Sequence, residues 1–162
     1  KTPVSLIMFD IDHFKNLNDT VGHRVGDQVL KSLGAQIQKI ATSLDDEHSS
    51  VMAARFGGEE FALILFGEIT DLAAPIADNL RKTVQKTEIM LLDTNNNQVP
   101  SDLRVTVSVG IADLWDGWKG AYMRNLVDFT DKALYHAKHS GRNCTALYTP
   151  EHTEPFVVLA QG

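Results

Sequence analysis

Residues 51–66 read VMAARFGGEEFALILF, and this stretch decides the fold. Two apolar runs, Val51–Phe56 and Phe61–Phe66, flank the four residues Gly57-Gly58-Glu59-Glu60. Two strand-like runs joined by a glycine-led turn are typical of a β-hairpin. The sequence therefore predicts a hairpin that carries Glu59 and Glu60 at its tip.

An earlier apolar run, Val4–Phe9, ends abruptly at Asp10. Its nearly continuous apolar character predicts a strand covered on both faces. Between this run and the hairpin, apolar residues recur at helical spacing from about Gly26 to about Ser43, which predicts a helix. The acidic and serine-rich residues 45–50 that follow predict a loop.

The chain after the hairpin continues with helical and strand patterns. The predicted elements are a helix over Ile69–Ile89, a turn-rich loop over Asp93–Asn97, a strand over Leu103–Ile111, a helix over Met123–Ser140 and a strand over Cys144–Tyr148. The last apolar run, Phe156–Leu159, fits an edge strand and an ordered tail equally. The order β-α-β-β-α-β, followed by a further α-β unit, predicts the α+β class: a ferredoxin-like sandwich with helices on one face of a mainly antiparallel sheet.

Length and composition limit the class of protein. A chain of 162 residues fits one domain over residues 1–162. Its formal net charge of −6 provides no global basic field, so we expect no nucleic-acid partner. The apolar runs are far shorter than the roughly 20 residues that a spanning helix needs, so we expect no membrane contact by this domain. The single cysteine, Cys144, indicates a reducing compartment, and we expect this domain in the cytoplasm, while a membrane anchor in a missing N-terminal part of the full-length protein stays open.

Carboxylates follow the first strand and the hairpin turn. Asp10 and Asp12 are two residues apart, so their side chains lie on one side of the sheet if strand geometry persists through Ile11. In a βαββ order the hairpin lies beside the first strand, so Glu59 and Glu60 approach Asp10. Mg²⁺ typically takes one or two carboxylates plus substrate phosphates. The pattern predicts a cation site assembled across neighbouring strands, although either motif alone fits a solvated strand end equally well.

The hairpin turn Gly57-Gly58-Glu59-Glu60-Phe61 resembles the signature of the GGDEF family of diguanylate cyclases, in its GGEEF form. The surrounding segments agree with this resemblance, which runs from about Val4 to Leu147. They are residues 9–19 (FDIDHFKNLND), Gly22-His23 with Gly26-Asp27, residues 108–112 (SVGIA), and residues 131–135 (DKALY) with Ala137-Lys138 and Gly141-Arg142-Asn143. The resemblance implies a nucleotidyl-cyclase-like version of the predicted sandwich.

The resemblance also implies an activity: condensation of two GTP molecules into cyclic di-GMP. It implies two Mg²⁺ (or Mn²⁺) ions per active site, with Asp10, the carbonyl of Ile11 and Glu59 as ligands. Glu59 and Glu60 are the candidate catalytic residues, and which of them takes the proton of the attacking 3′-hydroxyl stays open.

The remaining implied site residues bind the nucleotide. The backbone amides of His13 and Phe14 and the ammonium of Lys15 hold phosphates, and Gly58 lets the hairpin backbone approach the nucleotide. Lys138 and Arg142 are four residues apart, so we expect them to share a helix face, and the family uses this pair on the terminal phosphates. Asn18 and Asp27 match the guanine-reading pair, and His23 belongs to the same segment.

Two features depart from the family pattern. Many members carry an RxxD product-inhibition motif shortly before the signature, where this chain reads His48-Ser49-Ser50-Val51, so we expect no inhibition through that site. The usual DxLTGLxNR leader is also absent, and with no initiator Met we expect a fragment of a longer protein with an upstream sensor or regulatory domain. Since each domain holds one GTP, activity requires a homodimer.

Two other functions stay open. A haloacid-dehalogenase-like phosphohydrolase also opens with an apolar strand and DxD, but it requires a parallel sheet and Thr or Val where this chain has Phe14. A catalytically weak GTP-binding module that regulates a neighbouring domain fits the same motifs. The intact Glu59 and Glu60 favour the enzyme, and metal-dependent product formation separates the two.

Overall fold

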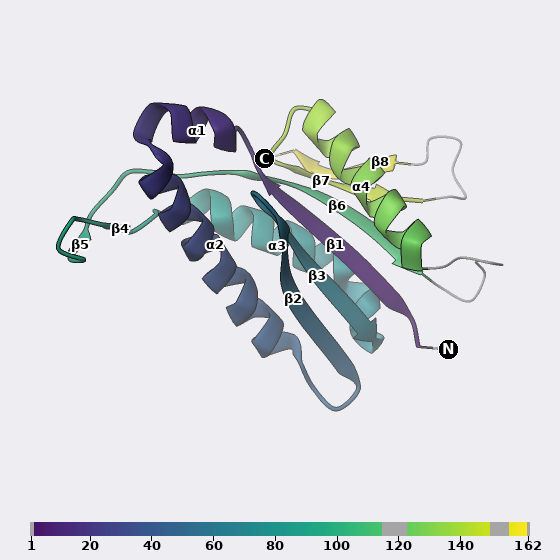
Figure 1. Cartoon of the computed structure of the whole chain (residues 1–162). Coiled ribbons are helices and arrows are strands. Elements are labelled where there is room, and N and C mark those ends of the chain that lie inside the picture. Colours follow the sequence, from purple (N-terminus) through teal and green to yellow (C-terminus); the bar gives the residue numbers. More distant parts are fainter. Residues whose placement is uncertain (1, 115–122, 150–155, 162) are drawn as a thin grey trace.

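One mixed sheet organises the chain, whose computed structural model describes residues 2–114, 123–149 and 156–161 (Figure 1). Among these residues the sheet has six strands in the order β2-β3-β1-β6-β7-β8. The strands are β1 (Val4–Ile11), β2 (Ser49–Gly57), β3 (Glu60–Gly67), β6 (Val107–Leu114), β7 (Cys144–Tyr148) and β8 (Phe156–Gln161). The helices are α1 (Phe14–Val21), α2 (His23–Leu44), a 3₁₀ turn η1 (Glu68–Leu72), α3 (Ala73–Lys86) and α4 (Met123–His139).

Strand β1 lies at the centre of the sheet and pairs antiparallel with β3 on one side and β6 on the other. The predicted hairpin is confirmed, because β2 pairs antiparallel with β3 around the glycine-led turn. The only parallel pair among the described strands joins β6 to β7. The antiparallel neighbours of β1 exclude the parallel sheet that a haloacid-dehalogenase-like fold needs. The α+β class predicted from the order of elements is confirmed.

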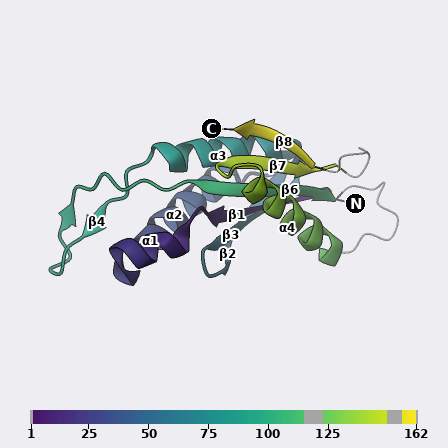
Figure 2. The ribbon, with the colours of Figure 1, turned by 90° about the horizontal axis from the view of Figure 1, so that it is seen from above.

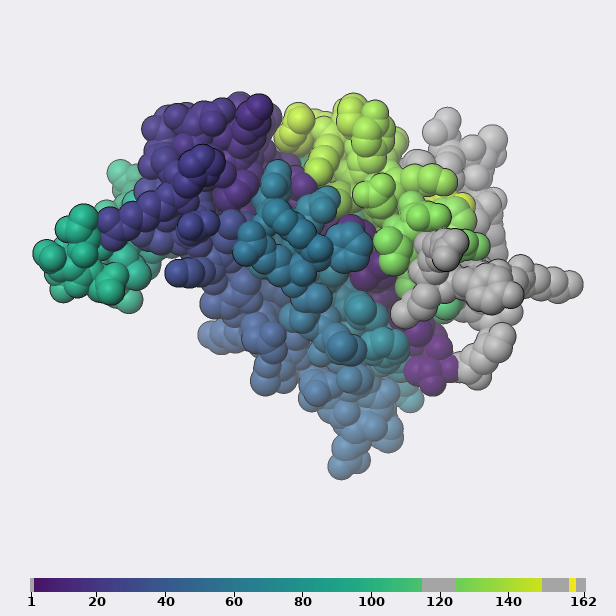
Figure 3. All heavy atoms as spheres, viewed as in Figure 1, coloured from purple at the N-terminus to yellow at the C-terminus, as the bar shows by residue number. Residues whose placement is uncertain are grey.

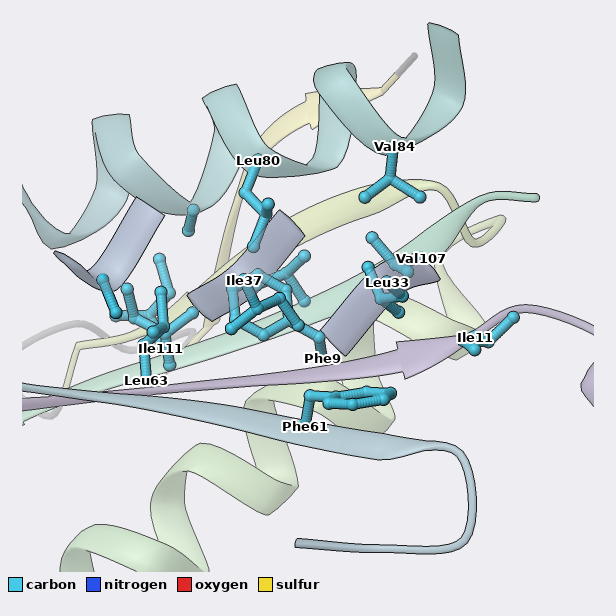
Figure 4. Close-up of a cluster of buried hydrophobic side chains, with 14 of the residues drawn as sticks. Phe9, Ile11, Leu33, Ile37, Phe61, Leu63, Leu80, Val84, Val107 and Ile111 are labelled. Atoms are coloured by element: carbon cyan, nitrogen blue, oxygen red, sulfur yellow. The ribbon is translucent and has the colours of Figure 1, made fainter. Parts of the chain in front are cut away.

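Alternate side chains of β1 enter two different cores. Phe9 and Ile11 face α2 and α3, where they meet Leu33 and Leu80 among other apolar side chains (Figure 4). Leu6 and Met8 face the opposite side, where Leu126 and Leu134 of α4 cover them. Burial of one such side chain stabilises the fold by about 1.5–3 kcal/mol, so both cores hold the sheet in place.

The helices therefore cover both faces of the sheet, and the expectation that they share one face is wrong. Figure 2 shows α3 and α4 on opposite sides of it. Gly110 of β6 explains how close α4 comes, because a Cβ there would overlap the backbone of Thr130 and Leu134. The order of elements along the chain does not specify which face of the sheet a helix covers. This glycine, in contrast, marks the face on which a helix backbone touches the sheet.

Two segments differ from the sequence prediction, and two others specify what it left open. The apolar pattern predicts a helix only from about Gly26, whereas α1 already covers Phe14–Val21, and β2 begins at Ser49, inside the expected loop. The last apolar run forms the edge strand β8, which pairs antiparallel with β7. The loop at Asp93–Asn97 is the tip of a small hairpin arm made by β4 (Leu91–Leu92) and β5 (Gln98–Val99), which projects beside α2 (Figure 1).

Candidate functional site

The end of β1 lies directly beside the hairpin turn. Asp10 pairs in register with Glu60 of β3, and the backbone N–H of Ile11 donates to the carbonyl of Glu59 at 3.4 Å. The expectation that the hairpin brings its glutamates to Asp10 is confirmed. Figure 3 shows the hairpin at the surface between α1 and α4.

Asp10 is nearly buried, with 7% of its surface exposed, and forms an ion pair with Lys138 of α4. The Lys138 Nζ lies 2.7 Å from the Asp10 Oδ2. Burial raises the pKa of Asp10, the Lys138 ammonium opposes this rise, and Glu59 and Asp12 add to it. Burial destabilises the charged form of this carboxylate, and the single ammonium compensates for that effect only in part. Such a carboxylate favours additional positive charge nearby.

Glu60 has a similar electrostatic setting but is more open to solvent. Partial burial raises its pKa, and the neighbouring carboxylate of Asp10 raises it further. A carboxylate whose pKa lies above its ordinary value holds a proton more readily, which suits a group that accepts one. Glu60 is therefore chemically able to accept a proton at this place.

Asp12 differs from Asp10 because hydrogen-bond donors surround it. Its Oδ1 accepts from the Ser108 hydroxyl at 2.6 Å, and its Oδ2 accepts from the Thr106 hydroxyl at 2.6 Å and the Asn143 backbone N–H at 3.0 Å. Strand geometry ends at Ile11, so Asp12 begins the turn that follows. Asp12 thus anchors this turn to β6 and to the loop after α4.

The hairpin turn depends on Gly58 and Arg55. Gly58 has φ +40°, a left-handed conformation that favours glycine, and a Cβ there would meet nothing within 4 Å. The Arg55 guanidinium donates to the Gly58 carbonyl, with its Nε at 2.9 Å. Arg55 holds the turn that presents Glu59, and sequence reasoning missed it because an arginine in a strand carries no distinguishing spacing.

The turn after β1 places the predicted phosphate-binding residues at the start of α1. His13 caps this helix in a left-handed conformation, with φ 57°, while Phe14 is buried and Lys15 is exposed. The first N–H groups of a helix have no partner inside it and carry the positive end of its dipole. These amides and Lys15 are chemically suited to an anionic ligand.

The corner between α1 and α2 brings Asn18 close to the first turn of α2. A Cβ at Gly26 would overlap the Asn18 Oδ1 and crowd Phe14, so only glycine allows this packing. The Asn18 Oδ1 is buried and has no hydrogen-bond partner among the described residues. Asp27 and His23 are exposed on the same turn of α2. Asn18 and Asp27 therefore border one corner of the molecule.

The hairpin arm is bonded to the same turn of α2. The Gln28 side chain donates to the Leu92 carbonyl at 3.2 Å and accepts from the Leu92 N–H at 2.6 Å. Arg24 donates to the Asp93 carbonyl. The arm thus holds the part of α2 that carries Asp27.

The C-terminal end of α4 corrects one prediction. Lys138 is helical, but α4 ends at His139, so Arg142 does not share its helix face. Gly141 has φ +108°, and the Arg142 N–H donates to the Ala137 carbonyl at 3.2 Å, which is the hydrogen bond of a Schellman helix end. The glycine stops the helix, and Arg142 follows in a left-handed conformation with an exposed side chain.

A divalent cation fits this donor set only with help from a ligand. Among the described residues no three His, Cys, Asp or Glu side chains form a group that could hold a metal ion. Asp10 supplies a nearly buried carboxylate and Glu59 a second one nearby. Mg²⁺ is commonly bound by one or two carboxylates together with backbone oxygens, water and substrate phosphates. The residues present thus fit a magnesium–nucleotide site better than a protein-only metal cage.

Comparison with known proteins agrees with this class of site. Residues 1–144 match the model of the family described as diguanylate cyclase, GGDEF domain. The chain is 42% identical over 139 residues to YhcK of Bacillus subtilis, covering 86% of this chain and 35% of that protein. It is 36% identical over 147 residues to diguanylate cyclase A of Treponema denticola, covering 91% of this chain and 36% of that protein.

A solved structure has the same fold. The GGDEF domain of DgcB from Caulobacter crescentus, in complex with c-di-GMP, superimposes with a TM-score of 0.70 at 35% identity, covering 90% of this chain and 78% of that chain. The chain belongs to the GGDEF family of diguanylate cyclase domains. It spans about a third of the length of the curated relatives it matches. No helix among the described residues is long and apolar enough to cross a membrane.

Proposed function

We propose that the domain condenses two molecules of GTP into cyclic di-GMP and releases two pyrophosphates. The observation that carries this proposal is the register of the sheet, which pairs Asp10 with Glu60 while Lys138 lies 2.7 Å from Asp10. Two acids at the ends of adjacent strands, with a cation from α4 beside one of them, form a surface that fits a metal-bound triphosphate. Membership of the family supports the reaction.

Two Mg²⁺ ions, or Mn²⁺, would be held by Asp10, the carbonyl of Ile11 and Glu59. When bound, they neutralise the triphosphate and make the attacking 3′-hydroxyl more acidic. The raised pKa of Asp10, caused mainly by burial, supports a cation at this place. In the GGEEF form Glu59 stands at the third position of the signature, and the longer glutamate side chain retains the carboxylate that binds the metal.

Residues around the turn after β1 bind the phosphates. The amides of His13 and Phe14 donate to phosphate oxygens, and Lys15 adds a positive charge. Lys138 reaches the same region, because it already contacts Asp10, and Arg142 extends from the loop after α4. Gly58 leaves open space on the hairpin turn for the nucleotide.

Asn18 and Asp27 select guanine, with His23 beside them. A carboxylate accepts from the guanine N1–H and exocyclic amine, whereas adenine presents an unprotonated N1 there. The buried Asn18 Oδ1 without a partner supports a hydrogen-bonding role, since such an atom costs about 1–3 kcal/mol when it stays unpaired. Glu60, whose pKa is raised by burial, accepts the proton of the attacking hydroxyl.

The reaction needs two copies of the domain, because each copy binds one GTP and the two sites must face each other across a two-fold axis. In the full protein an upstream sensor or regulatory domain controls this pairing, and the cytoplasm supplies GTP. Product inhibition through the residues at positions 48–51 is not expected, because they contain neither arginine nor aspartate. Tight calorimetric binding of cyclic di-GMP that is lost in His48→Ala would contradict this last expectation.

The test is to incubate the concentrated chain with GTP and Mg²⁺ and to separate the nucleotides by chromatography. We expect cyclic di-GMP or its linear precursor from the wild type, none from Glu60→Ala, and none with ATP. Glu47→Ala is the matched control, because Glu47 is an exposed glutamate in the loop before β2. It should retain wild-type turnover.

The other outcomes separate the competing functions. Mg²⁺-dependent GTP binding without product, measured by calorimetry at concentrations that permit dimerisation, would indicate a GTP-binding regulatory module. Absence of both product and GTP binding would refute the proposed site.

A further inference from the structure

Arg81 of α3 is a buried cation that the proposed chemistry does not use. Only 1% of its surface is exposed. It lies on the apolar stripe of α3, one turn from Ala77 and Val84, where an apolar side chain is expected. A guanidinium stays charged at any physiological pH, so its burial is costly unless several acceptors surround it.

The partners of Arg81 lie on two different elements. Its Nε donates to the Asp78 Oδ1 at 3.0 Å, one turn earlier on the same helix. Its Nη1 donates to both the Asn143 backbone carbonyl, at 3.0 Å, and the Asn143 Oδ1, at 2.9 Å. The planar fork of the guanidinium thus holds Asp78 with its Nε and Nη2, while its Nη1 fixes the backbone and the side chain of one residue in the loop after α4.

Asn143 passes this constraint on to the turn after β1. It has φ 44°, a left-handed conformation, and its backbone N–H donates to the Asp12 Oδ2 at 3.0 Å. Asp12 in turn is held by the hydroxyls of Thr106 and Ser108 at 2.6 Å each. A continuous series of hydrogen bonds therefore joins α3, the loop after α4, the turn after β1 and β6.

Two members of this series adjoin residues of the candidate site. Asp12 lies between Ile11 and His13, and Asn143 follows Arg142. Packing alone does not require an arginine here, because well-packed apolar residues often replace a buried ion pair without loss of stability. The use of a cation with two fixed acceptors indicates that the position of the loop matters.

We propose that Arg81 is a positioning residue that fixes Arg142 and the turn from Asp10 to Phe14 relative to each other. It acts through Asn143 and Asp12 and touches no substrate. The inference rests on the proposed function, since it assigns a role toward the same GTP site. Without Arg81 the two phosphate-binding segments are no longer held in one arrangement.

The test compares Arg81→Met with Lys82→Met. Methionine has a similar length and removes the fork, and Asp78 keeps an ion partner because Lys82 Nζ lies 2.7 Å from its Oδ2. Lys82→Met removes the other cation on Asp78 and leaves the series intact. Assayed well below the melting temperature of each variant, Arg81→Met should lower kcat about 10- to 100-fold and weaken Mg²⁺-dependent GTP binding. Lys82→Met should retain both, and Arg81→Lys should resemble Arg81→Met because it lacks the fork.

A second readout does not depend on turnover. Hydrogen exchange of the Asn143 amide should be slow in the wild type and in Lys82→Met, and faster in Arg81→Met. If Arg81→Met does not fold, Asn143→Gly replaces it, because glycine accepts the left-handed conformation and removes only the side-chain acceptor. It should lower kcat in the same direction by a smaller factor.

The outcomes separate this inference from the proposed function. A lowered melting temperature with unchanged kcat and GTP affinity in these variants would make Arg81 merely structural and overturn the inference, while wild-type cyclic di-GMP formation would leave the proposed function intact. A wild type that binds Mg²⁺ and GTP without turnover refutes the reaction but not the inference, provided that Arg81→Met weakens that binding. A wild type that does not bind GTP overturns both.

Discussion

Asp10 and Asp12 lie two residues apart and have contrasting surroundings. Both are nearly buried, with 7% and 8% of their surfaces exposed. Asp10 contacts one partly exposed ammonium, and burial raises its pKa. Asp12 accepts three hydrogen bonds from two hydroxyls and a backbone amide.

The contrast shows how one short motif serves two purposes. A carboxylate that keeps its charge mainly through one movable lysine has capacity left for a ligand. A carboxylate whose lone pairs are occupied by fixed donors orients the backbone instead. Substitution at Asp10 should therefore affect activity with little change in stability. Substitution at Asp12 should lower stability and also activity, because Asp12 belongs to the series that starts at Arg81.

The largest effect is expected for Asp10→Asn. It removes a predicted metal ligand, so GTP turnover should fall about 100-fold or more. The melting temperature should stay within about 2 °C of wild type, because the lost charge was poorly stabilised by its surroundings. Product chromatography and calorimetric unfolding on the same sample test both parts. Unchanged turnover would place the metal elsewhere.

Asp12→Ala should lower stability in addition to turnover. It leaves the donors of Ser108, Thr106 and Asn143 without their acceptor, and we expect the free energy of unfolding to fall by about 3 kcal/mol. Urea unfolding at pH 7 measures this loss. A stability equal to that of Asp10→Asn would mean that the two carboxylates do not differ as their hydrogen bonds indicate.

Gly26→Ala tests the proposed guanine-binding corner between α1 and α2, where Asn18 lies. The added Cβ would overlap the Asn18 Oδ1 and push that side chain out of place. We expect KM for GTP to rise about tenfold, with a smaller change in kcat. Gly34→Ala is the control on the same helix, because its Cβ would meet only Phe61, at 3.4 Å. Equal KM values for both variants would contradict a role for Asn18 in base binding.

The smallest effect is expected for substitution of Asp78, which accepts a hydrogen bond from Arg81 at the start of the series that leads to Asn143 and Asp12. Burial opposes its ionisation, but hydrogen bonds from Lys82 and Arg81 outweigh burial and lower its pKa. A carboxyl group whose pKa is lower in the folded state stabilises the fold at pH values above its unfolded pKa of about 3.9. This contribution is lost as the pH falls through the folded pKa. Asp78→Asn should thus cost less than about 1 kcal/mol at pH 7 and progressively less below about pH 4. Urea unfolding at several pH values measures the difference, and a pH-independent cost would contradict the ion pair.

Much of the fold follows from apolar patterns in the sequence. The hairpin, the long helix and the strand Cys144–Tyr148 all have strong periodicity or clear turn residues. Helix α1 escaped prediction because its eight residues include Asn16, Asn18, Asp19 and Thr20, which favour turns and caps over helix interiors. The face covered by α4 escaped because order along the chain does not determine it.

The candidate site also contains some residues that the sequence predicts and others that it does not. Asp10, Glu59 and Glu60 are recognisable because strand order brings them to one edge. The anchoring role of Asp12 is not recognisable, since its partners lie about a hundred residues away in the sequence. Arg81 gives one usable signal, a charged residue on an apolar helical stripe, and that signal does not identify its partner.

The hairpin arm made by β4 and β5 has a consequence for protein engineering. Its tip is exposed, and Asn96 there already adopts a left-handed turn conformation, so a foreign ligand-binding domain can be inserted at this point with little strain. The arm is bonded through Gln28 to the turn of α2 that carries Asp27. An inserted domain that moves when it binds its own ligand would pull on that turn, which makes the arm a place to build a biosensor.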